Sequence, residues 1–253
     1  MNRALSLKLL LLAVSALLLS SCGDSKNKQS KDTSSFTNAS LKGNFVFSVS
    51  GTDQIDGDFS AAGSFQADGS GKITSGIEDV NFASGVDPGV TVSGVYRIDS
   101  DGRGTITLND SSGPIDFLEI QLASNGSAKI LNFDSTGASG TLDKQDTSSF
   151  SQAGSYSFTL AGVEEDTITA SGSFSSDASG NISGGNGSFN QGSSSSNLAL
   201  SGMMGPAFEN GRGQLLLGSN KFSYYVVSGS RVILTGLEDS ILLHGEAKKE
   251  PRI

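Results

Sequence analysis

An internal duplication constrains the fold of this chain more than any other feature of its sequence. The segment 43–51 recurs at 154–162, and both copies place large apolar residues at alternate positions. Further along, Asp101-Gly102-Arg103-Gly104 recurs as Asn210-Gly211-Arg212-Gly213. Blocks that repeat in the same order indicate two copies of one structural unit. We expect the two units to cover residues 41–146 and 153–250.

Each unit has the pattern of consecutive short strands. Apolar and polar residues alternate with the period of a half-buried strand, and no segment after the N-terminal apolar run has a helical period. Turns rich in Gly, Asp, Asn and Ser separate the strands, which favours an antiparallel meander. The candidate strands of the first unit are 44–50, 59–67, 72–81, 90–98, 104–108, 115–122, 128–133 and 140–144.

The edges of such a meander decide between an open and a closed sheet. A flat meander leaves two unpaired edges, which promote aggregation. Closing about eight strands into a barrel removes both edges and leaves an interior that side chains can fill. We therefore predict an all-β fold of two tandem meander barrels. Two β-sandwiches, or one barrel shared between the copies, are the alternatives, since periodicity does not distinguish closure from stacking.

The N-terminus resembles the export signal and processing site of bacterial lipoproteins. Arg3 and Lys8 lead into an uncharged apolar run, and Leu19-Ser20-Ser21-Cys22 ends it. The run is shorter than the roughly 20 residues of a membrane-spanning helix. The resemblance implies a signal peptide at 1–21, acylation of Cys22, for example with palmitate, and attachment to the membrane. Because Gly23 is not the Asp of inner-membrane retention, it implies the outer membrane.

Composition limits the partners of the mature chain. Cys22 is the only cysteine, so no disulfide forms within the chain. The net charge is −9, and removal of the signal takes away two positive charges. Nucleic acid is therefore not expected as a partner, because a phosphate backbone needs clustered Lys and Arg. Residues 22–40 are mostly Ser, Asn, Lys, Asp and Thr, which predicts a disordered tether after the lipidated cysteine.

The repeat blocks also resemble a known group of proteins. Segments 41–45, 62–69, 76–81 and 94–96 resemble a family of uncharacterised exported bacterial lipoproteins with tandem Gly-rich β-repeats. The resemblance covers most of both copies and implies a fold and export, with no particular chemistry and no cofactor beyond the lipid on Cys22. More loosely, a meander that opens on Gly-X-aromatic is similar to lipocalin and avidin barrels, although the Trp usual there is absent.

Two adjacent pairs are candidate ligand contacts. Glu78 and Asp79 are neighbours on a predicted strand, so their side chains point to opposite faces, and we expect surface carboxylates beside a turn. Tyr224 and Tyr225 likewise face opposite ways. Alignment of the copies places Tyr225 inside the second unit and Tyr224 outside, where an exposed Tyr could contact a sugar or a protein.

A calcium site is a weaker candidate. Asp99 and Asp101 have the alternating carboxylates of a calcium loop, because a hard cation needs several oxygens on one turned segment. The second copy keeps this turn but has Phe208 and Asn210 at the matching positions. A turn that survives the loss of its carboxylates has a structural role, so we expect no bound metal.

These observations favour a non-enzymatic, lipid-anchored protein of the cell envelope that binds or adheres to an envelope polysaccharide or protein. A carrier of a small apolar ligand is the main alternative, and it requires a cavity inside a barrel lined by Phe45, Phe47, Tyr156 and Phe158. An envelope hydrolase would require two carboxyl groups facing one cleft at about 5–10 Å.

Overall fold

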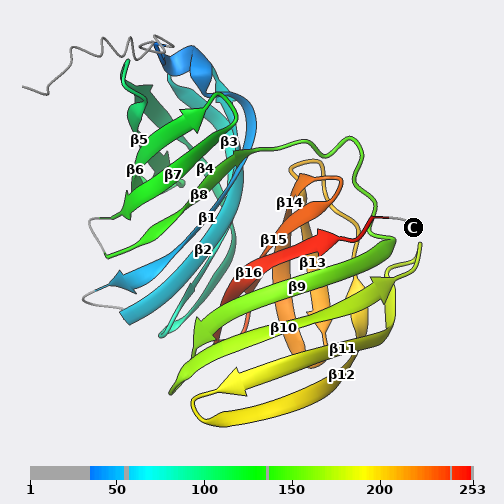
Figure 1. Cartoon of the computed structure of the whole chain (residues 1–253). Helices are drawn as coiled ribbons and strands as arrows, with labels where there is room; N and C mark the ends of the chain where they lie inside the picture. Colours follow the sequence, from blue (N-terminus) through cyan, green and yellow to red (C-terminus); the bar gives the residue numbers. More distant parts are fainter. Residues whose placement is uncertain (1–34, 54–56, 135–136, 240, 252–253) are drawn as a thin grey trace, which may run out of the picture. The chain divides into compact units, whose positions relative to one another are not determined.

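The computed structural model describes residues 35–53, 57–134, 137–239 and 241–251. The predicted signal peptide, Cys22 and the first part of the tether lie outside these residues. The chain forms two closed antiparallel barrels, β1–β8 and β9–β16 (Figure 1). No helix among the described residues has the length and hydropathy needed to span a membrane.

The prediction of two tandem barrels is confirmed, and the sandwich and shared-barrel alternatives are wrong. All strands are antiparallel, and each barrel closes when its last strand pairs with its first. The eight candidate strands of the first copy all fall within β1–β8. The strands are β1 (Lys42–Asp53), β2 (Gly57–Asp68), β3 (Lys72–Phe82), β4 (Gly85–Ile98), β5 (Arg103–Asn109), β6 (Pro114–Ser124), β7 (Ser127–Phe133), β8 (Ser139–Lys144), β9 (Gly154–Val163), β10 (Thr167–Ser176), β11 (Asn181–Gln191), β12 (Ser194–Met204), β13 (Arg212–Leu217), β14 (Asn220–Ser228), β15 (Arg231–Gly236) and β16 (Leu242–Lys249).

The two copies match in strand register as well as in sequence. Phe47 pairs with Gly63 in the first barrel, and Phe158 pairs with Gly172 in the second. A Cβ atom on Gly63 would lie 2.4 Å from the ring of Phe47. Each glycine thus leaves room for an aromatic ring of the first strand to lie across the second strand.

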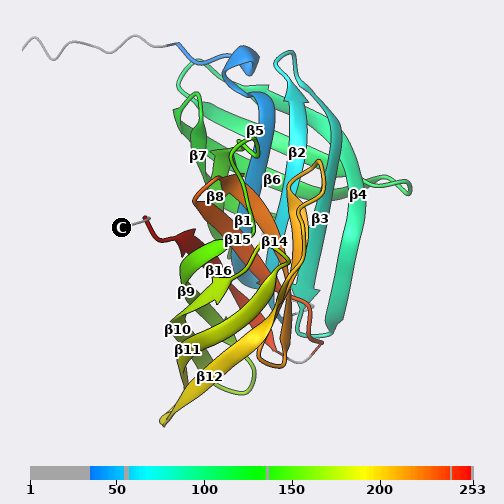
Figure 2. The ribbon, with the colours of Figure 1, turned by 90° about the vertical axis from the view of Figure 1, so that its right-hand side faces the viewer.

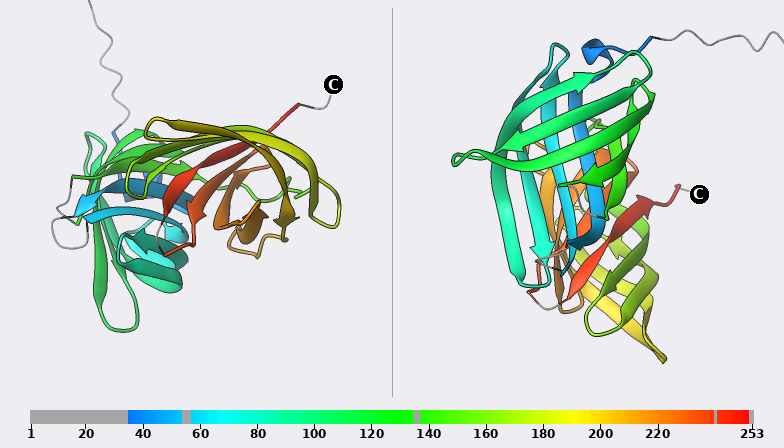
Figure 3. Two further views of the ribbon diagram at one scale, coloured as in Figure 1. Left: turned by 90° about the horizontal axis from the view of Figure 1, so that it is seen from below. Right: turned by 90° about the vertical axis from the view of Figure 1, so that its left-hand side faces the viewer.

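Large side chains fill both interiors. Phe45 and Phe65 stack with ring centroids 6.0 Å apart, and Tyr156 and Phe174 stack at 5.2 Å. All four are at most 3% exposed. Figure 3 shows the strands of the first barrel, in blue to green, wrapping around this interior. The aromatic residues that would line a carrier's cavity therefore form the cores of the barrels.

The end of the predicted tether belongs to the first barrel. The 3-10 helix η1 (Asn38–Ser40) follows Phe36, which packs against the core, and Leu41 is fully buried. The hydroxyl of Tyr96 donates to the carbonyl oxygens of Asn38 and Leu41. The expectation that the tether continues to residue 40 is wrong from Phe36 onward, because these side chains find apolar and hydrogen-bonding partners on the barrel.

The two barrels contact each other through outward-facing side chains. Val46 and Ala62, on the outside of β1 and β2, form one buried cluster with Tyr225, Val227 and Ile233 of β14 and β15. Ile77 of β3 packs against the same cluster. Figure 2 shows β14 and β15, in orange, close to β1 and β2. The central part of the outer face of β1–β3 is thus covered by the second barrel.

Candidate functional site

Glu78 and Asp79 point to opposite faces of β3, as predicted, but neither lies on the surface. Glu78 is 1% exposed and Asp79 is fully buried. The expectation of surface carboxylates is therefore wrong. Strand alternation sends Glu78 into the interior of the first barrel and Asp79 into the contact between the barrels, where each meets residues distant in sequence.

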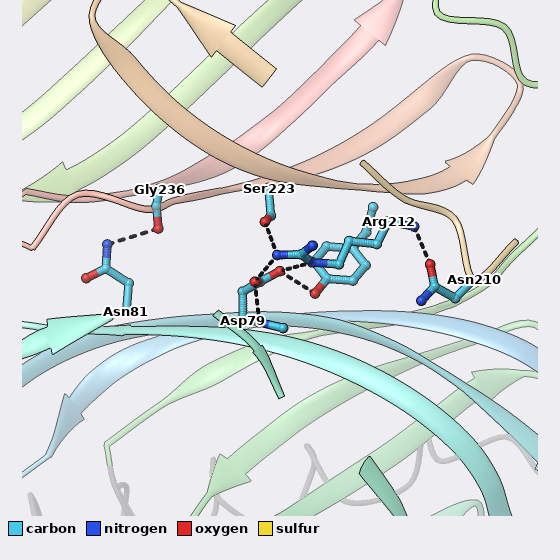
Figure 4. A network of polar contacts seen from close by, with 8 residues as sticks. Asp79, Asn81, Asn210, Arg212, Ser223 and Gly236 are labelled. Carbon is cyan, nitrogen blue, oxygen red and sulfur yellow. Dashed lines mark hydrogen bonds and ion pairs between the residues drawn. The ribbon is translucent and has the colours of Figure 1, made fainter. Parts of the chain in front are cut away.

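Asp79 forms a bidentate ion pair with Arg212 of the second barrel (Figure 4). The Nε atom of Arg212 donates to Oδ2 at 2.8 Å, and its Nη2 atom donates to Oδ1 at 2.6 Å. The side chains of Arg212 and Asp79 are 10% and 1% exposed. A planar guanidinium matches a carboxylate in this geometry. The pair therefore fixes the relative orientation of the two side chains as well as the distance between them.

Further donors complete the coordination of Asp79. The hydroxyl of Tyr225 donates to Oδ2 at 2.5 Å, and the backbone N–H of Gly89 donates to Oδ1 at 2.8 Å. Arg212 also donates to the hydroxyl of Ser223. Hydrogen bonding to Asp79 raises the pKa of Arg212, and burial raises the pKa of Tyr225. Both oxygens of Asp79 thus accept hydrogen bonds from residues of both barrels. We conclude that this carboxylate holds the barrels together and is not available to a ligand.

A second polar contact lies beside this pair. The amide of Asn81 donates to the carbonyl oxygens of Gly236, Glu238 and Ile241, at 3.1–3.3 Å. Figure 4 shows Asn81 and Asp79 reaching from the first barrel toward the second. Alternate residues of β3 therefore carry two of the polar contacts between the barrels, and further contacts join Ser64 of β2 to the carbonyl of Asn210 and Asp143 of β8 to Arg231 of β15.

Glu78 belongs to a buried cluster of carboxyl groups in the first barrel. It shares a hydrogen bond with Asp116, which in turn interacts with Asp134. Burial raises the pKa of all three groups, and for Glu78 the charge of Asp116 adds to this effect. Glu78 Oε2 and Asp116 Oδ2 have no hydrogen-bond partner. Such a pair holds a proton at neutral pH, because two buried carboxylates in contact cannot both ionise.

This cluster predicts an unusual pH dependence of stability. Unfolded Glu78 ionises above about pH 4.3, whereas burial and the charge of Asp116 raise the pKa of folded Glu78 well above that value. Its contribution to stability is therefore fully present below about pH 4.3 and is progressively lost as the pH rises above this value, because the folded state then holds a proton that the unfolded state has released. Glu78→Gln should flatten the decline of the melting temperature between pH 5 and pH 9.

Thermal unfolding of the two proteins at several pH values would measure this difference. Glu165→Gln, at an exposed loop position, is the matched control and should leave the decline unchanged. Parallel curves for Glu78→Gln and the unmodified chain would contradict the assignment of a shared proton to this cluster.

The two tyrosines have exchanged their expected faces. Tyr224 lies in the core of the second barrel, and its hydroxyl donates to the carbonyl of Gly205. Tyr225 points outward into the contact between the barrels. Strand pairing explains the error. Gly213 pairs with Tyr224, and the equivalent Gly104 of the first barrel pairs with Ile120, so Tyr224 is the true equivalent of the inward-facing Ile120. The expected alignment was shifted by one residue, which exchanges the two faces of a strand.

The weaker calcium candidates are engaged with arginines. Asp99 forms an ion pair with Arg97 at 2.8 Å, and Asp101 contacts Arg103 at 3.5 Å. Within the part of the chain that the structure describes, no group of three or more His, Cys, Asp or Glu side chains is arranged to hold a metal ion.

The outer face of β9–β12 is exposed and carries small uncharged side chains. Core residues of these strands alternate with outward-facing residues, and pairing places Thr159, Ser171, Ser188 and Asn197 in one row across the four strands. Rows on either side have the same character. The outward residues include Ser155, Ser157, Thr159, Ala161, Thr167, Thr169, Ser171, Ser173, Ser175, Ser183, Asn186, Ser188, Asn190, Ser195, Asn197, Ala199, Ser201 and Met203, all of them exposed or partly exposed. None of them is charged, although charged residues make up 17% of the chain.

The matching face of the first copy shows what distinguishes this surface. When the two barrels are aligned by their strand pairing, Asp79 is equivalent to Ser188, Ile77 to Asn186, and Ala62 to Ser171. In the first copy these positions are covered by the second barrel, whereas in the second copy small polar residues replace them. We call the outward face of β9–β12 the hydroxyl face.

Comparisons with known proteins give only distant likenesses. No protein family profile and no curated protein matches the chain. Among solved structures, a protein provisionally assigned as AttH from Nitrosomonas europaea is 8% identical, with a TM-score of 0.27, and the match covers 82% of this chain and 92% of that one. The structure of CghA with Sch210972 is 9% identical, with a TM-score of 0.28, and covers 81% and 87%.

Sequence reasoning missed Arg212, Asp116 and the docking of Phe36. Arg212 occupies a turn that both copies share, and its counterpart Arg103 in the first copy is exposed. The turn motif alone therefore gives no sign that Arg212 is buried. A signal for Phe36 was present, because Asp-Thr-Ser-Ser-Phe occurs at both 32–36 and 146–150. Phe150 packs against Tyr224 of the second barrel, with ring centroids 5.8 Å apart. The repeat therefore begins before the first strand, and its leading phenylalanine is part of the folded unit.

Proposed function

We propose that this chain is a non-catalytic binding module, attached to the cell envelope through a lipid on Cys22, and that it binds a neutral polysaccharide through the hydroxyl face. One observation carries the proposal: an exposed surface across four strands presents hydroxyl and amide groups without any charge. Hydroxyls and amides both donate and accept hydrogen bonds, as the hydroxyls of a sugar chain require. A polysaccharide without charge also avoids repulsion from an acidic protein.

The shape of the side chains supports the same function. Ser, Thr and Asn have few rotatable bonds, so holding them against a ligand costs little conformational entropy. Adjacent side chains already interact, as between Ser155 Oγ and Ser175 Oγ at 3.1 Å. A regular array on a strand scaffold can contact several sugar units at once, which compensates for the weak contribution of each neutral hydrogen bond.

The interiors give less support to the alternatives. A carrier needs room along the barrel axis, where Phe47 and Phe158 instead pack among other core residues. A hydrolase of the expected kind needs two carboxyl groups at a cleft. Glu78 and Asp116 are the carboxyl groups that most resemble such a pair, but they are only 1% and 8% exposed. A polysaccharide does not reach them.

Affinity electrophoresis in gels containing dextran, laminarin or mannan tests the proposal. We expect at least one neutral polysaccharide to retard the chain, and Ser171→Glu to weaken this retardation at least about tenfold in apparent Kd, since a carboxylate at the centre of the face would be desolvated without a partner. Ser93→Glu, on the exposed outside of β4, is the matched control.

Two outcomes contradict the proposal. Equal losses in Ser171→Glu and Ser93→Glu would place binding outside the hydroxyl face. The absence of retardation by any neutral polysaccharide, with retardation by the anionic polymer alginate, would exclude the proposed ligand class.

A further inference from the structure

The free edge of β12 points to a second, different contact. β12 pairs with β11 along Ser194–Leu200, but β13 reaches only Gly202–Met204 on the other side. No strand in the described ranges is paired with the outer edge of Ser194–Leu200. Figure 1 shows β12, in yellow, as the last strand at the lower margin of its sheet. An unpaired edge of this kind is a template for another strand.

The direction of the free backbone groups follows from strand alternation. The carbonyl of Ser201 accepts from the N–H of Gly218, so it points toward the β13 side. N–H and C=O groups of an antiparallel strand change sides at every residue. Those of Ser195, Asn197 and Ala199 therefore point to the open edge. All three residues are exposed.

The first barrel has a matching edge that is protected. In β4, pairing with β5 begins at Ser93, so Gly85–Val92 has no paired strand on that side among the residues that the structure describes. This segment contains Asp87 and Pro88, and its pairing with β3 is interrupted by register shifts. Charge, proline and irregular backbone are the usual protection of an edge against pairing. β12 has no charge and no proline, so its edge lacks these protections.

We propose that the β12 edge binds the β12 edge of a second copy of this chain, as an antiparallel pair centred on Asn197. The two-fold axis would place Asn197 opposite its own counterpart and Ser195 opposite Ala199, so that all the free backbone groups find partners. Identical surfaces that meet across a two-fold axis form the commonest kind of homodimer.

The charge distribution favours a second copy as the occupant. The chain as a whole has a net charge of −9, but residues 178–208 contain no charged side chain. Two acidic molecules can approach along this segment without placing like charges opposite each other. An edge that receives a charged peptide would instead carry the opposite charge. Because one pair of strands buries less than the roughly 1,200 Å² of a stable interface, we expect a weak, concentration-dependent dimer.

Cross-linking of the full chain in detergent tests this contact. With Asn197→Cys, a short bismaleimide should give a covalent dimer at least about tenfold more efficiently than with Asn190→Cys, which lies on the same face one strand further from the edge. Asn197→Lys should lower the dimer fraction in sedimentation velocity, since two lysines would face each other across the axis. The unmodified chain controls for cross-links through Cys22.

Equal cross-linking of the two cysteine variants would overturn the proposal, as would a dimer fraction unaffected by Asn197→Lys. Cross-linking of Asn197→Cys only to other proteins in an envelope preparation, with no dimer of the purified chain, would assign the edge to a different partner and also overturn it. Polysaccharide binding is measured separately, so the failure of either proposal is recognised independently.

Discussion

Replacement of Arg212 by alanine should lower the free energy of unfolding by about 3–5 kcal/mol, because the change leaves Asp79 as a buried charge without its ion-pair partner. Asp79 is fully buried, and Tyr225 and Gly89 cannot neutralise it. Urea unfolding followed by circular dichroism measures the loss. Calorimetry should also resolve two transitions in this variant, since the contact between the barrels couples their unfolding.

A double-mutant cycle separates the ion pair from its surroundings. Asp79→Ala should be about as destabilising as Arg212→Ala, and the double variant should lose no more than either one, because the two side chains act together. Arg97→Ala is the control, since its pair with Asp99 is exposed and should contribute at most about 1 kcal/mol. Additive losses would show that the pair does not hold the barrels together.

Phe47→Ala should destabilise the chain by about 3–5 kcal/mol, through lost burial and the cavity that remains. Phe47 is fully buried, packs against Phe65 and lies across Gly63, which cannot fill the space. Denaturant unfolding measures the effect. Phe117→Ala, where the side chain is 37% exposed, should cost less than about 1 kcal/mol.

The same variant distinguishes a packed interior from a carrier. If the barrel is filled, the unmodified chain should bind no small apolar probe such as benzene, and Phe47→Ala should acquire binding in the new cavity. Benzene binding by the unmodified chain, together with a small effect of Phe47→Ala on stability, would favour the carrier alternative.

The fold was predictable because its determinants are local and repeated. Alternation in segments such as 43–51 and 154–162 gives the strands, and their short turns give the meander. Closure of each meander into a barrel was predictable because the unpaired edges of an open sheet promote aggregation. The free edge of β12 was not predictable in this way, because it depends on how short β13 is and on where its pairing with β12 begins.

The candidate site was less predictable because its contacts join distant residues. Asp79 and Arg212 are 133 positions apart, and nothing in either local sequence indicates the other. The faces of Tyr224 and Tyr225 depended on a register that a shift of one residue reverses. The hydroxyl face was visible in the sequence only as Ser and Asn in a Gly-rich segment, which also describes loops.

NMR chemical-shift mapping with a neutral polysaccharide that retards the chain would locate the binding surface residue by residue. We expect the shifts to concentrate at outward positions of β9–β12, around Ser171, Ser188 and Asn197, while the amides of Phe47 and Phe158 stay unchanged. Shifts concentrated inside either barrel, or around Glu78 and Asp116, would contradict binding through the hydroxyl face.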